Sequence, residues 1–243
     1  MLSFFARGMR RMLRVTGIDV VPFTNTNPDF VIDLAIRRHS ITTLLDVGAN
    51  RGQFAQRAID YGFRGTIHSF EPMPQVFDRL ARRVARHANW HAHRIALSDS
   101  TGMATLTIGA NDQTSSLRVP LVESARTIAA MTVVGQVEVP TQRLDDFIAD
   151  AAIVAAQCFL KLDVQGAEMA VLRGAAAIFS VVPLIQLETS LVPAYDQESK
   201  LEEMIHVIHA AGMVVRNIRP VYTNENTGEL MQVDLIAERW RAS

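Results

Sequence analysis

The sequence predicts a doubly wound α/β domain, in which helices cover both faces of a mostly parallel sheet. Apolar runs of strand length alternate with amphipathic helical stretches along most of the chain. Residues 44–53 have the pattern of a buried strand, a turn of small residues and the start of a helix. Of the 243 residues 49% are apolar, which is enough for a sheet buried on both faces. The length suits one large domain better than two small ones.

Seven places in the chain have the pattern of a strand in the main sheet. Each is a short apolar run bounded by glycine, proline or polar residues. The expected strands cover residues 41–47, 65–70, 90–97, 158–164, 183–187, 213–218 and 229–237.

Helices are expected between these strands, and residues with capping preferences mark their ends. Asn27 precedes Pro28 at the start of the first helix, and Thr141 is expected to cap a later one. Gly62 and Gly212 each follow the last residue of a helical stretch. The expected helices cover residues 27–38, 53–61, 75–88, 141–150, 168–179 and 201–211.

Residues 100–140 break the alternation of strands and helices. Residues 103–108 and 133–139 both alternate like strands, with a polar stretch between them. Two extended segments in succession predict an inserted hairpin before the fourth strand, near the carboxyl edge of the sheet.

The turn after the first strand is expected to form a ligand site. Gly48 and Gly52 lack a Cβ atom, so the backbone can turn tightly there or let a ligand approach closely. A pocket forms where such a turn meets the carboxyl edge of a parallel sheet. The free N–H groups of the following helix favour a phosphate or a carboxylate.

A carboxylate at the tip of the second strand adds to this prediction. Glu71 follows the strand-like run 66–70 and lies about one βαβ crossover after Asp46. An acid at this place can accept hydrogen bonds from two ribose hydroxyls. The turn and Glu71 together predict a nucleoside cofactor.

The spacing of the turn favours S-adenosylmethionine (SAM) over a nicotinamide dinucleotide. The nicotinamide fingerprint G-x-G-x-x-G requires glycines where Asn50 and Gln53 stand, and Gly52 is out of register. SAM has no pyrophosphate, and its amino-acid end suits a looser turn that contains an amide. We therefore interpret the alternation of Asp46, Gly48, Asn50 and Gly52 as a SAM site, the alternative being an ordinary turn in another doubly wound enzyme.

Composition argues against several classes of partner and location. The net charge of −1 and the pI near 6.7 show no basic excess for RNA or DNA. No apolar run reaches the roughly 18–20 residues of a membrane span. The single cysteine, Cys158, cannot form an internal disulfide and is expected to be a core thiol, which fits the reducing cytoplasm.

Six short motifs follow one another in an order that is typical of one enzyme family. They are DVGANRG (46–52), FEPMP (70–74), ALSD (96–99), LDDF (144–147), LKLDVQGAE (160–168) and VLRGA (171–175). The chain thus resembles the FkbM-type SAM-dependent methyltransferases over roughly residues 44–213. The resemblance implies the class I methyltransferase fold, a Rossmann-like sheet of seven strands with the last strand antiparallel. It also implies O-methylation of a small-molecule, sugar or polyketide hydroxyl.

The resemblance also implies roles for residues at the strand ends. It places the amino-acid end of SAM on the turn after the first strand, the ribose on the second strand tip and the adenine edge on the third. A solvated turn residue is the alternative for Asp99. The implied contacts are Asp46, Gly48, Asn50 and Gly52 for the amino-acid end, Glu71 for the ribose, and Ser98 with Asp99 for the adenine.

Methyl transfer to an alcohol requires a group that takes the hydroxyl proton. Asp163 is expected to end the fourth strand and Glu188 the fifth, so both would face the cofactor crevice. In one route Asp163 is the general base, and nearby Lys161 adjusts its proton affinity or forms an ion pair with one of the acids. In the other route Asp163, Glu168 and Glu188 hold a Mg²⁺ that acidifies the hydroxyl, although Glu168 also suits a helix N-terminus on its own.

The first 40 residues are expected to form a helical extension of a methyltransferase domain at residues 41–243. Residues 1–15 place arginines among apolar residues at helical spacing. Such a helix can lie on an anionic membrane surface, or it can pack on the domain edge with its arginines in solvent, which we favour. A secretory signal is not expected, because arginines interrupt the apolar stretch.

Together these expectations describe a cytoplasmic enzyme that catalyses SAM-dependent O-methylation, with peripheral membrane contact through the N-terminus as an open alternative. The expected acceptor is a hydroxyl of a sugar moiety on a glycolipid or secondary metabolite, and the basic N-terminus favours a lipid-linked one. Three alternatives stay open: an NAD(P)-dependent oxidoreductase, an RNA methyltransferase and a non-catalytic SAM-binding module. The missing glycines count against the first and the near-neutral charge against the second.

Overall fold

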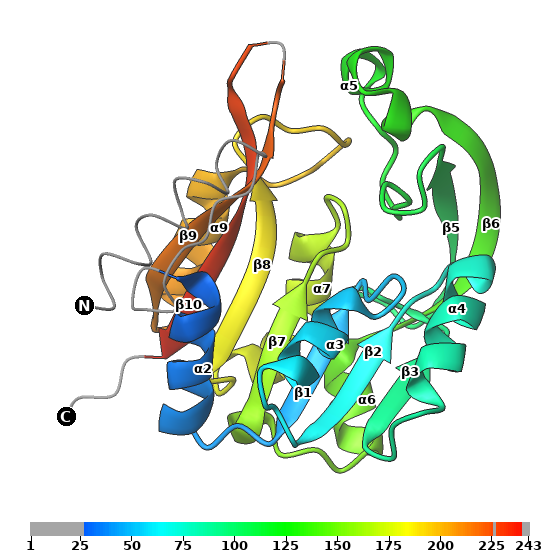
Figure 1. The fold of residues 1–243 in the computed structure, drawn as a ribbon. Coiled ribbons are helices and arrows are strands. Elements are labelled where there is room, and N and C mark those ends of the chain that lie inside the picture. The colour runs from blue at the N-terminus through cyan, green and yellow to red at the C-terminus, as the bar shows by residue number, and fades with distance from the viewer. Residues whose placement is uncertain (1–26, 226, 240–243) are drawn as a thin grey trace, which may run out of the picture.

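A mixed sheet forms the centre of the molecule, with helices on both of its faces (Figure 1). The computed structural model describes residues 27–225 and 227–239. Within this part of the chain, the main sheet has seven strands in the order β3-β2-β1-β7-β8-β10-β9. The strands are β1 (Thr43–Val47), β2 (Thr66–Phe70), β3 (Trp90–His93), β7 (Cys158–Leu162), β8 (Leu184–Ser190), β9 (Met213–Thr223) and β10 (Leu230–Arg239).

The last strand, β10, runs antiparallel to both of its neighbours, β8 and β9. The pairs β1–β2, β1–β7, β2–β3 and β7–β8 are parallel. The expected doubly wound sheet of seven strands with an antiparallel last strand is therefore confirmed. Because the parallel strands all end at the same edge, the loops that follow them meet there.

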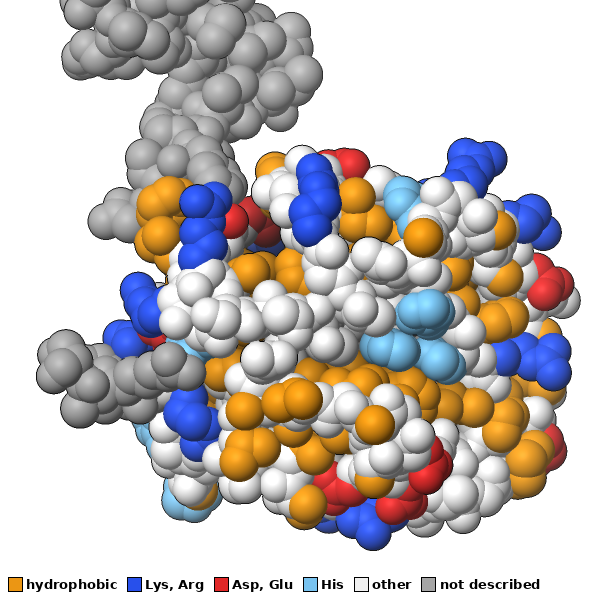
Figure 2. All heavy atoms as spheres, turned by 90° about the horizontal axis from the view of Figure 1, so that it is seen from below, with side chains coloured by type: hydrophobic (Ala, Val, Ile, Leu, Met, Phe, Trp, Pro, Cys, Tyr) orange, Lys and Arg blue, Asp and Glu red, His pale blue; other side chains and the backbone are white. Residues whose placement is uncertain are grey.

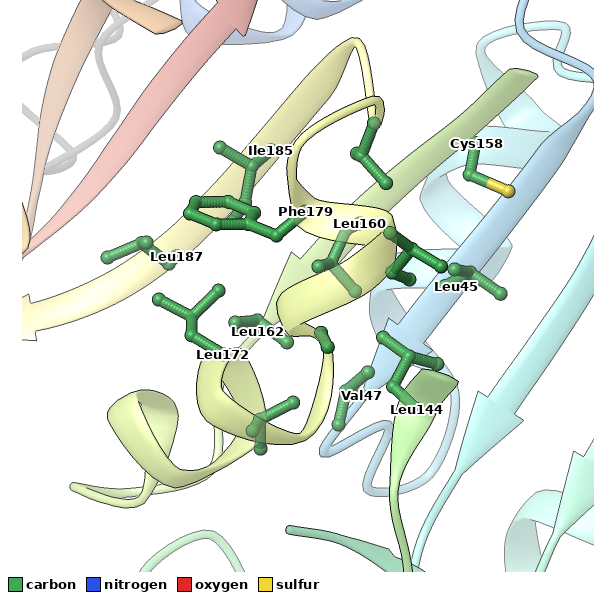
Figure 3. Packing of buried hydrophobic residues seen from close by; sticks show 14 of the residues in the cluster. Leu45, Val47, Leu144, Cys158, Leu160, Leu162, Leu172, Phe179, Ile185 and Leu187 are labelled. Carbon is green, nitrogen blue, oxygen red and sulfur yellow. The ribbon is translucent and has the colours of Figure 1, made fainter. Parts of the chain in front are cut away.

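Two hydrophobic layers hold the helices on the sheet. Alternate residues of each strand point to opposite faces, so Leu44 and Leu45 of β1 enter different layers. One face is covered by α2 (Pro28–Arg38), α3 (Gln53–Asp60) and α4 (Pro74–Val84). The other is covered by α6 (Leu144–Asp150), α7 (Glu168–Gly174), α8 (Ala176–Phe179) and α9 (Leu201–Ala210). Figure 3 shows side chains of β1, β7, β8, α7 and α8 converging in this second layer, where Cys158 is buried as a core thiol.

The predicted insertion forms a small second sheet beside the main one. Strand β5 (Gly102–Gly109) pairs antiparallel with β6 (Val133–Gln142), and β4 (Ala96–Leu97) pairs parallel with β6. The short helix α5 (Val122–Thr127) lies between β5 and β6 in the chain. In Figure 1 this sheet stands to one side of the carboxyl edge, and the β9–β10 hairpin stands on the other.

The second sheet accounts for two boundaries that the sequence did not predict. The strand expected at 90–97 is divided, because β3 stays in the main sheet whereas β4 pairs with β6. The helix expected to start at Thr141 starts at Leu144, because Thr141 and Gln142 pair with β4.

Two further boundaries differ from the prediction. The helix expected at 168–179 divides at Ala175, and the Asp145 carboxylate accepts hydrogen bonds from the N–H groups of Ala177 and Ile178 at 3.1 Å each, which starts α8. Strand β8 continues to Ser190 by pairing with β10, so Glu188 lies within the strand and not at its end.

The start of the described chain agrees with the capping signal. The side-chain oxygen of Asn27 accepts a hydrogen bond from the N–H of Asp29 at 2.9 Å, as expected for an N-cap before Pro28. Ile32 and Ala35 of α2 pack into the layer that covers β1 and β10. The basic amphipathic stretch at residues 1–15 lies outside the described residues. Among those described, none of the helices is both long enough and apolar enough to cross a lipid bilayer.

Three histidines stack on the surface strands β2 and β3. The rings of His91 and His93 lie 5.2 and 5.3 Å from that of His68, and Nδ1 of His68 lies 3.1 Å from Nε2 of His93. Burial and the neighbouring imidazoles lower the pKa of His68 to about 4, so this ring is neutral at pH 7 and can stack without charge repulsion. Figure 2, a view from below Figure 1, shows histidine side chains grouped beside apolar ones.

The packing around Gly52 gives a stability prediction. Its φ is +78°, and a Cβ atom would lie 2.7 Å from the Trp90 ring and 2.9 Å from Leu80. We expect Gly52→Ala to lower the free energy of unfolding by about 2–5 kcal/mol, the sum of a left-handed alanine and an overpacked core. Gly62, with φ +100° and nothing within 4 Å of its missing Cβ, is the matched control, and Gly62→Ala should cost only about 1–2 kcal/mol. Equal losses in urea unfolding would show that the Trp90 contact is unimportant.

Candidate active site

A cavity of about 690 Å³ opens at the carboxyl edge of the main sheet, within the described part of the chain. Its walls come from the loops after the parallel strands, from the insertion and from the β9–β10 hairpin. Six of the predicted site residues line it: Gly48, Asn50, Glu71, Lys161, Asp163 and Glu188. The other lining residues include Gln53, Phe54, Arg57, Phe70, Pro72, 95–97, Leu106, 112–117, Val164, Gln165, Gln186, Tyr195, 219–222, Gln232 and Asp234.

Gly48 brings two backbone turns into direct contact at the cavity wall. Its φ is +71°, and a Cβ atom there would overlap the carbonyl oxygen of Asp163. The N–H groups of Gly48 and Ala49 donate to the carbonyl oxygen of Phe70 at 3.1 and 3.0 Å. Glycine is therefore required at position 48 so that the turns after β1 and β7 can close together. Gly52, by contrast, packs on the core and does not line the cavity.

Glu71 is held at the cavity by two backbone N–H groups. Its Oε2 accepts from the N–H of Asn50 and its Oε1 from the N–H of Met73, both at 2.9 Å. Burial raises the pKa of Glu71 to about 7, although both hydrogen bonds favour the charged form. Each carboxylate oxygen keeps a second lone pair for a ligand.

Beneath this wall, Asp46 and Lys161 form a buried ion pair. Asp46 is 0% exposed, and its Oδ1 lies 3.2 Å from Nζ of Lys161. The Lys161 ammonium also donates to the carbonyl oxygens of Gly48 at 2.9 Å and Val47 at 3.3 Å. Burial disfavours the ammonium, but the carboxylates of Asp46 and Asp163 outweigh this and raise the pKa of Lys161. Lys161 is therefore a cation that fixes the turn after β1, and Asp46 supports it from below the cavity.

Two carboxylates face the cavity beyond Lys161. Asp163, just after β7, has a side chain that is 37% exposed, and its Oδ2 lies 3.5 Å from Nζ of Lys161. Glu188 on β8 is buried, and burial with the nearby carboxylates of Asp163, Glu168 and Asp234 raises its pKa well above the usual value. The amide nitrogen of Gln165 donates to both acids, at 3.1 Å to Asp163 and 3.2 Å to Glu188.

The expected magnesium site of Asp163, Glu168 and Glu188 is not formed. Glu168 is buried, accepts a hydrogen bond from the N–H of Val164 at 2.8 Å and is absent from the cavity lining. In the parts of the chain that the structure describes, no three His, Cys, Asp or Glu side chains are arranged to hold a metal ion. Glu168 instead caps the turn before α7, which corrects the three-carboxylate hypothesis.

Ser98 and Asp99 also lie outside the cavity lining. Asp99 pairs with Arg173, whose Nε and Nη2 donate at 3.1 and 2.9 Å. These hydrogen bonds lower the pKa of Asp99. The cause is the path of β4, which pairs with β6 and carries the following residues toward α7. The residues that face the cavity here are the preceding ones, 95–97.

Sequence reasoning did not assign a role to the polar residues on the β8–β10 side of the cavity. Gln186 donates to Asp234 Oδ2 at 2.9 Å, and Arg219 Nε donates to the same atom at 3.0 Å. All three side chains line the cavity. A single acid within the apolar run 233–237 was the available signal for Asp234. Gln186, the single polar residue of the apolar run 181–187, carried the same signal, and Arg219 carried none.

The insertion and the loop after β8 together roof the cavity. The N–H of Leu121 donates to the carbonyl of Ala194 at 2.9 Å, and the N–H of Asp196 donates to that of Val119 at 2.8 Å. On the opposite wall, the side-chain amide of Asn50 donates to the carbonyl of Asp112 at 3.2 Å. These hydrogen bonds join the two segments of the roof to each other and the insertion to the wall at Asn50, so the roof covers part of the cavity.

The sequence matches one known protein family. A model of the methyltransferase FkbM domain matches residues 46–215. The chain is 31% identical over 144 residues to Methyltransferase 1 of Beauveria bassiana, a match that covers 54% of this chain and only 57% of that protein. It is 24% identical over 185 residues to the 2-O-methyltransferase NoeI of Sinorhizobium fredii, covering 73% of this chain and 75% of that one. A SAM-bound structure of magnesium protoporphyrin IX methyltransferase from Synechocystis PCC 6803 has a TM-score of 0.48 and 12% identity, covering 96% of this chain and 91% of that one.

The buried ion pair gives a second stability prediction. Lys161→Met leaves the Asp46 carboxylate buried without its counter-ion, so we expect a loss of about 3–5 kcal/mol in the free energy of unfolding. Asp46→Leu combined with Lys161→Met removes both charges and should recover at least half of that loss. Strictly additive losses in a double-mutant cycle would contradict a direct coupling between the two side chains.

Proposed function

Because the chain belongs to the methyltransferase FkbM domain family, we propose that it transfers the methyl group of SAM to a hydroxyl of a sugar moiety. The observation that carries the proposal is one cavity with a carboxylate suited to a ribose, Glu71, at one side and the Asp163–Glu188 pair at the other. Its volume of about 690 Å³ falls in the range of about 300–1,000 Å³ that is usual for small-molecule sites.

In the proposed complex, the wall formed by the turns after β1 and β2 and by residues 95–97 at β4 holds the cofactor. The turn at Gly48 and Asn50 receives the amino-acid end, and Glu71 accepts hydrogen bonds from the ribose hydroxyls. The adenine lies against the apolar residues 95–97, in place of the predicted contacts with Ser98 and Asp99. Asp46 and Gly52 contribute to cofactor binding indirectly, by fixing the shape of the turn after β1.

The side chains beyond Lys161 perform the chemistry on the acceptor. When bound, SAM supplies an electrophilic methyl group. Asp163, the more exposed carboxylate of the pair, accepts the hydroxyl proton as the oxygen–methyl bond forms and the sulfur–methyl bond breaks. The roof of the cavity limits water and holds the acceptor oxygen in line with the methyl group.

A polyhydroxylated acceptor fits the β8–β10 side of the cavity. This wall offers amide, carboxylate and guanidinium groups from Gln186, Asp234, Arg219 and Gln232, which can both donate to and accept from sugar hydroxyls. Similarity to a protein named as a 2-O-methyltransferase supports transfer of the methyl group to an oxygen atom. The lipid-linked form of that acceptor, a cytoplasmic location and contact of residues 1–15 with a membrane surface are parts of the proposal that rest on sequence alone.

The direct test is transfer of a labelled methyl group from SAM into an extract of host lipids and glycosides, followed by mass spectrometry of the product. We expect the label on a sugar oxygen. Label in RNA, or binding of SAM with no acceptor modified in any extract, would overturn the proposal.

Replacing the proposed base separates binding from catalysis. We expect Asp163→Asn to bind SAM within a few-fold of the wild-type affinity and to lose about 10²–10⁴ in turnover, since a positioned base contributes about that factor. Asp60→Asn, at the exposed end of α3, is the control and should turn over normally. Full turnover in Asp163→Asn would remove Asp163 from proton transfer.

The raised pKa of Glu71 predicts a pH dependence of SAM binding. Ribose hydroxyls donate to the ionised carboxylate, whose population falls as the pH drops below about 7. The affinity measured by calorimetry should therefore decrease by about tenfold per pH unit below 7 and level off above it. In Glu71→Gln the affinity should be lower at pH 8 and almost independent of pH. A wild-type affinity that stays constant from pH 8 to pH 5.5 would contradict the contact with the ribose.

A further inference from the structure

The amide of Gln165 lies between the two carboxylates of the cavity. Its Nε2 is 3.1 Å from Asp163 Oδ1 and 3.2 Å from Glu188 Oε1, so its two amide protons can serve one acid each. Among the described residues, no other side chain donates a hydrogen bond to both acids. Gln165 therefore occupies the position in which like charges would otherwise face one another.

The two acids fix which end of the Gln165 amide faces them. The reversed amide would place its oxygen against two acceptor-only carboxylates and lose both hydrogen bonds. At the other end, the hydroxyl of Tyr195 lies 3.0 Å from Gln165 Oε1 and 3.1 Å from the carbonyl oxygen of Thr114, and its one proton can serve either acceptor. Tyr195 is 1% exposed, so its ring cannot move aside without disturbing the packing.

The backbone of Gln165 is held independently of its side chain. Its φ is +55°, and its carbonyl oxygen accepts a hydrogen bond from Ser116 Oγ of the insertion at 2.6 Å. The neighbouring Gly166 packs beneath the Tyr195 ring, where a Cβ atom would lie 3.0 Å from the Cβ of Tyr195. Strand end, insertion and roof loop thus converge on one residue, and the strained backbone is compensated by these contacts.

We propose that Gln165 is a positioning residue that fixes the separation and ionisation of the Asp163–Glu188 pair, with the buried Tyr195 hydroxyl in contact with the other end of its amide. This inference rests on the proposed function, in which the pair flanks the acceptor hydroxyl. A donor shared by two carboxylates stabilises their charged forms and sets the gap that the acceptor oxygen enters.

The charges around Glu188 explain why such a donor matters. Glu188 faces the carboxylates of Asp163, Glu168 and Asp234, while Lys161 is the opposing cation and Arg219 neutralises part of the Asp234 charge. Burial and three like charges favour the protonated form of Glu188. Without the amide of Gln165, the protonated form of Glu188 would be favoured still more, and the Glu188 carboxyl group would no longer be held in position.

The test follows the titration of Glu188 by NMR in protein labelled with ¹³C at the glutamate Cδ atoms, and it needs no acceptor. Glu188→Gln identifies the resonance, and Asp163→Asn provides a reference of opposite sign, since removing a like charge lowers the pKa of Glu188. In Gln165→Leu we expect that pKa to rise by about 1–2 pKa units, the usual effect of a lost hydrogen bond to a charged group. An unchanged or lowered pKa would overturn the proposal.

Two further variants and one control check that the change in the pKa of Glu188 comes from the lost hydrogen bonds. Gln165→Asn keeps an amide and tolerates a left-handed backbone but is too short to reach both acids, so it should raise the pKa of Glu188 as the leucine variant does. Tyr195→Phe should give a smaller rise in the pKa of Glu188.

Gln197 is another glutamine with a positive φ, +56°, and it lies outside the cavity lining. Gln197→Leu therefore controls for the effect of the backbone and should leave the pKa of Glu188 unchanged. A shift as large in Gln197→Leu as in Gln165→Leu would also overturn the proposal. SAM binding by the wild type is measured separately, so that a failure of the proposed function can be told apart from a failure of this inference.

Discussion

The buried pair of Lys161 and Asp46 is the interaction on which the rest of the site depends. At the carboxyl end of β1, the Lys161 ammonium donates to the carbonyl oxygens of Gly48 and Val47, and the latter also accepts from the N–H of Asp163. A cation this deeply buried requires a counter-ion, which Asp46 supplies from the neighbouring strand. The pair thereby holds the turn after β1 in a fixed position relative to the sheet, and both Glu71 and Asp163 are positioned relative to that turn.

Above this floor, the shape of the cavity comes from segments that are distant in sequence. The turn after β1 contacts the turn after β7 through Gly48, and the insertion reaches the loop after β8 through Leu121. The glycine is needed for steric reasons, while the insertion contributes hydrogen-bonded backbone and a small core of its own, in which Leu106 and Val139 pack with Met73 and Val76. In the proposed complex, the cofactor therefore lies on the turns after β1 and β2 and on β4, and the acceptor lies on side chains of β8, β9 and β10.

The sequence was informative wherever a local pattern determines the structure. Strand periodicity predicted the seven strands, and the rule that parallel strands present their carboxyl ends to a site predicted Glu71 and Asp163. It failed where a distant partner decides the outcome. Asp99 turns to Arg173, which no local signal indicates, and β4 leaves the main sheet for β6. No local pattern indicated the role of Gln165, because that role requires Asp163, just after β7, and Glu188, within β8, to lie beside one another.

One residue, Asn50, belongs to both halves of the cavity. Its backbone N–H serves the Glu71 carboxylate, while its side-chain amide serves the insertion at Asp112, which also pairs with Arg51. A ligand that shifts this residue on one side must alter the geometry on the other. The turn after β1 and the insertion are therefore joined at the cavity wall through the position of one residue.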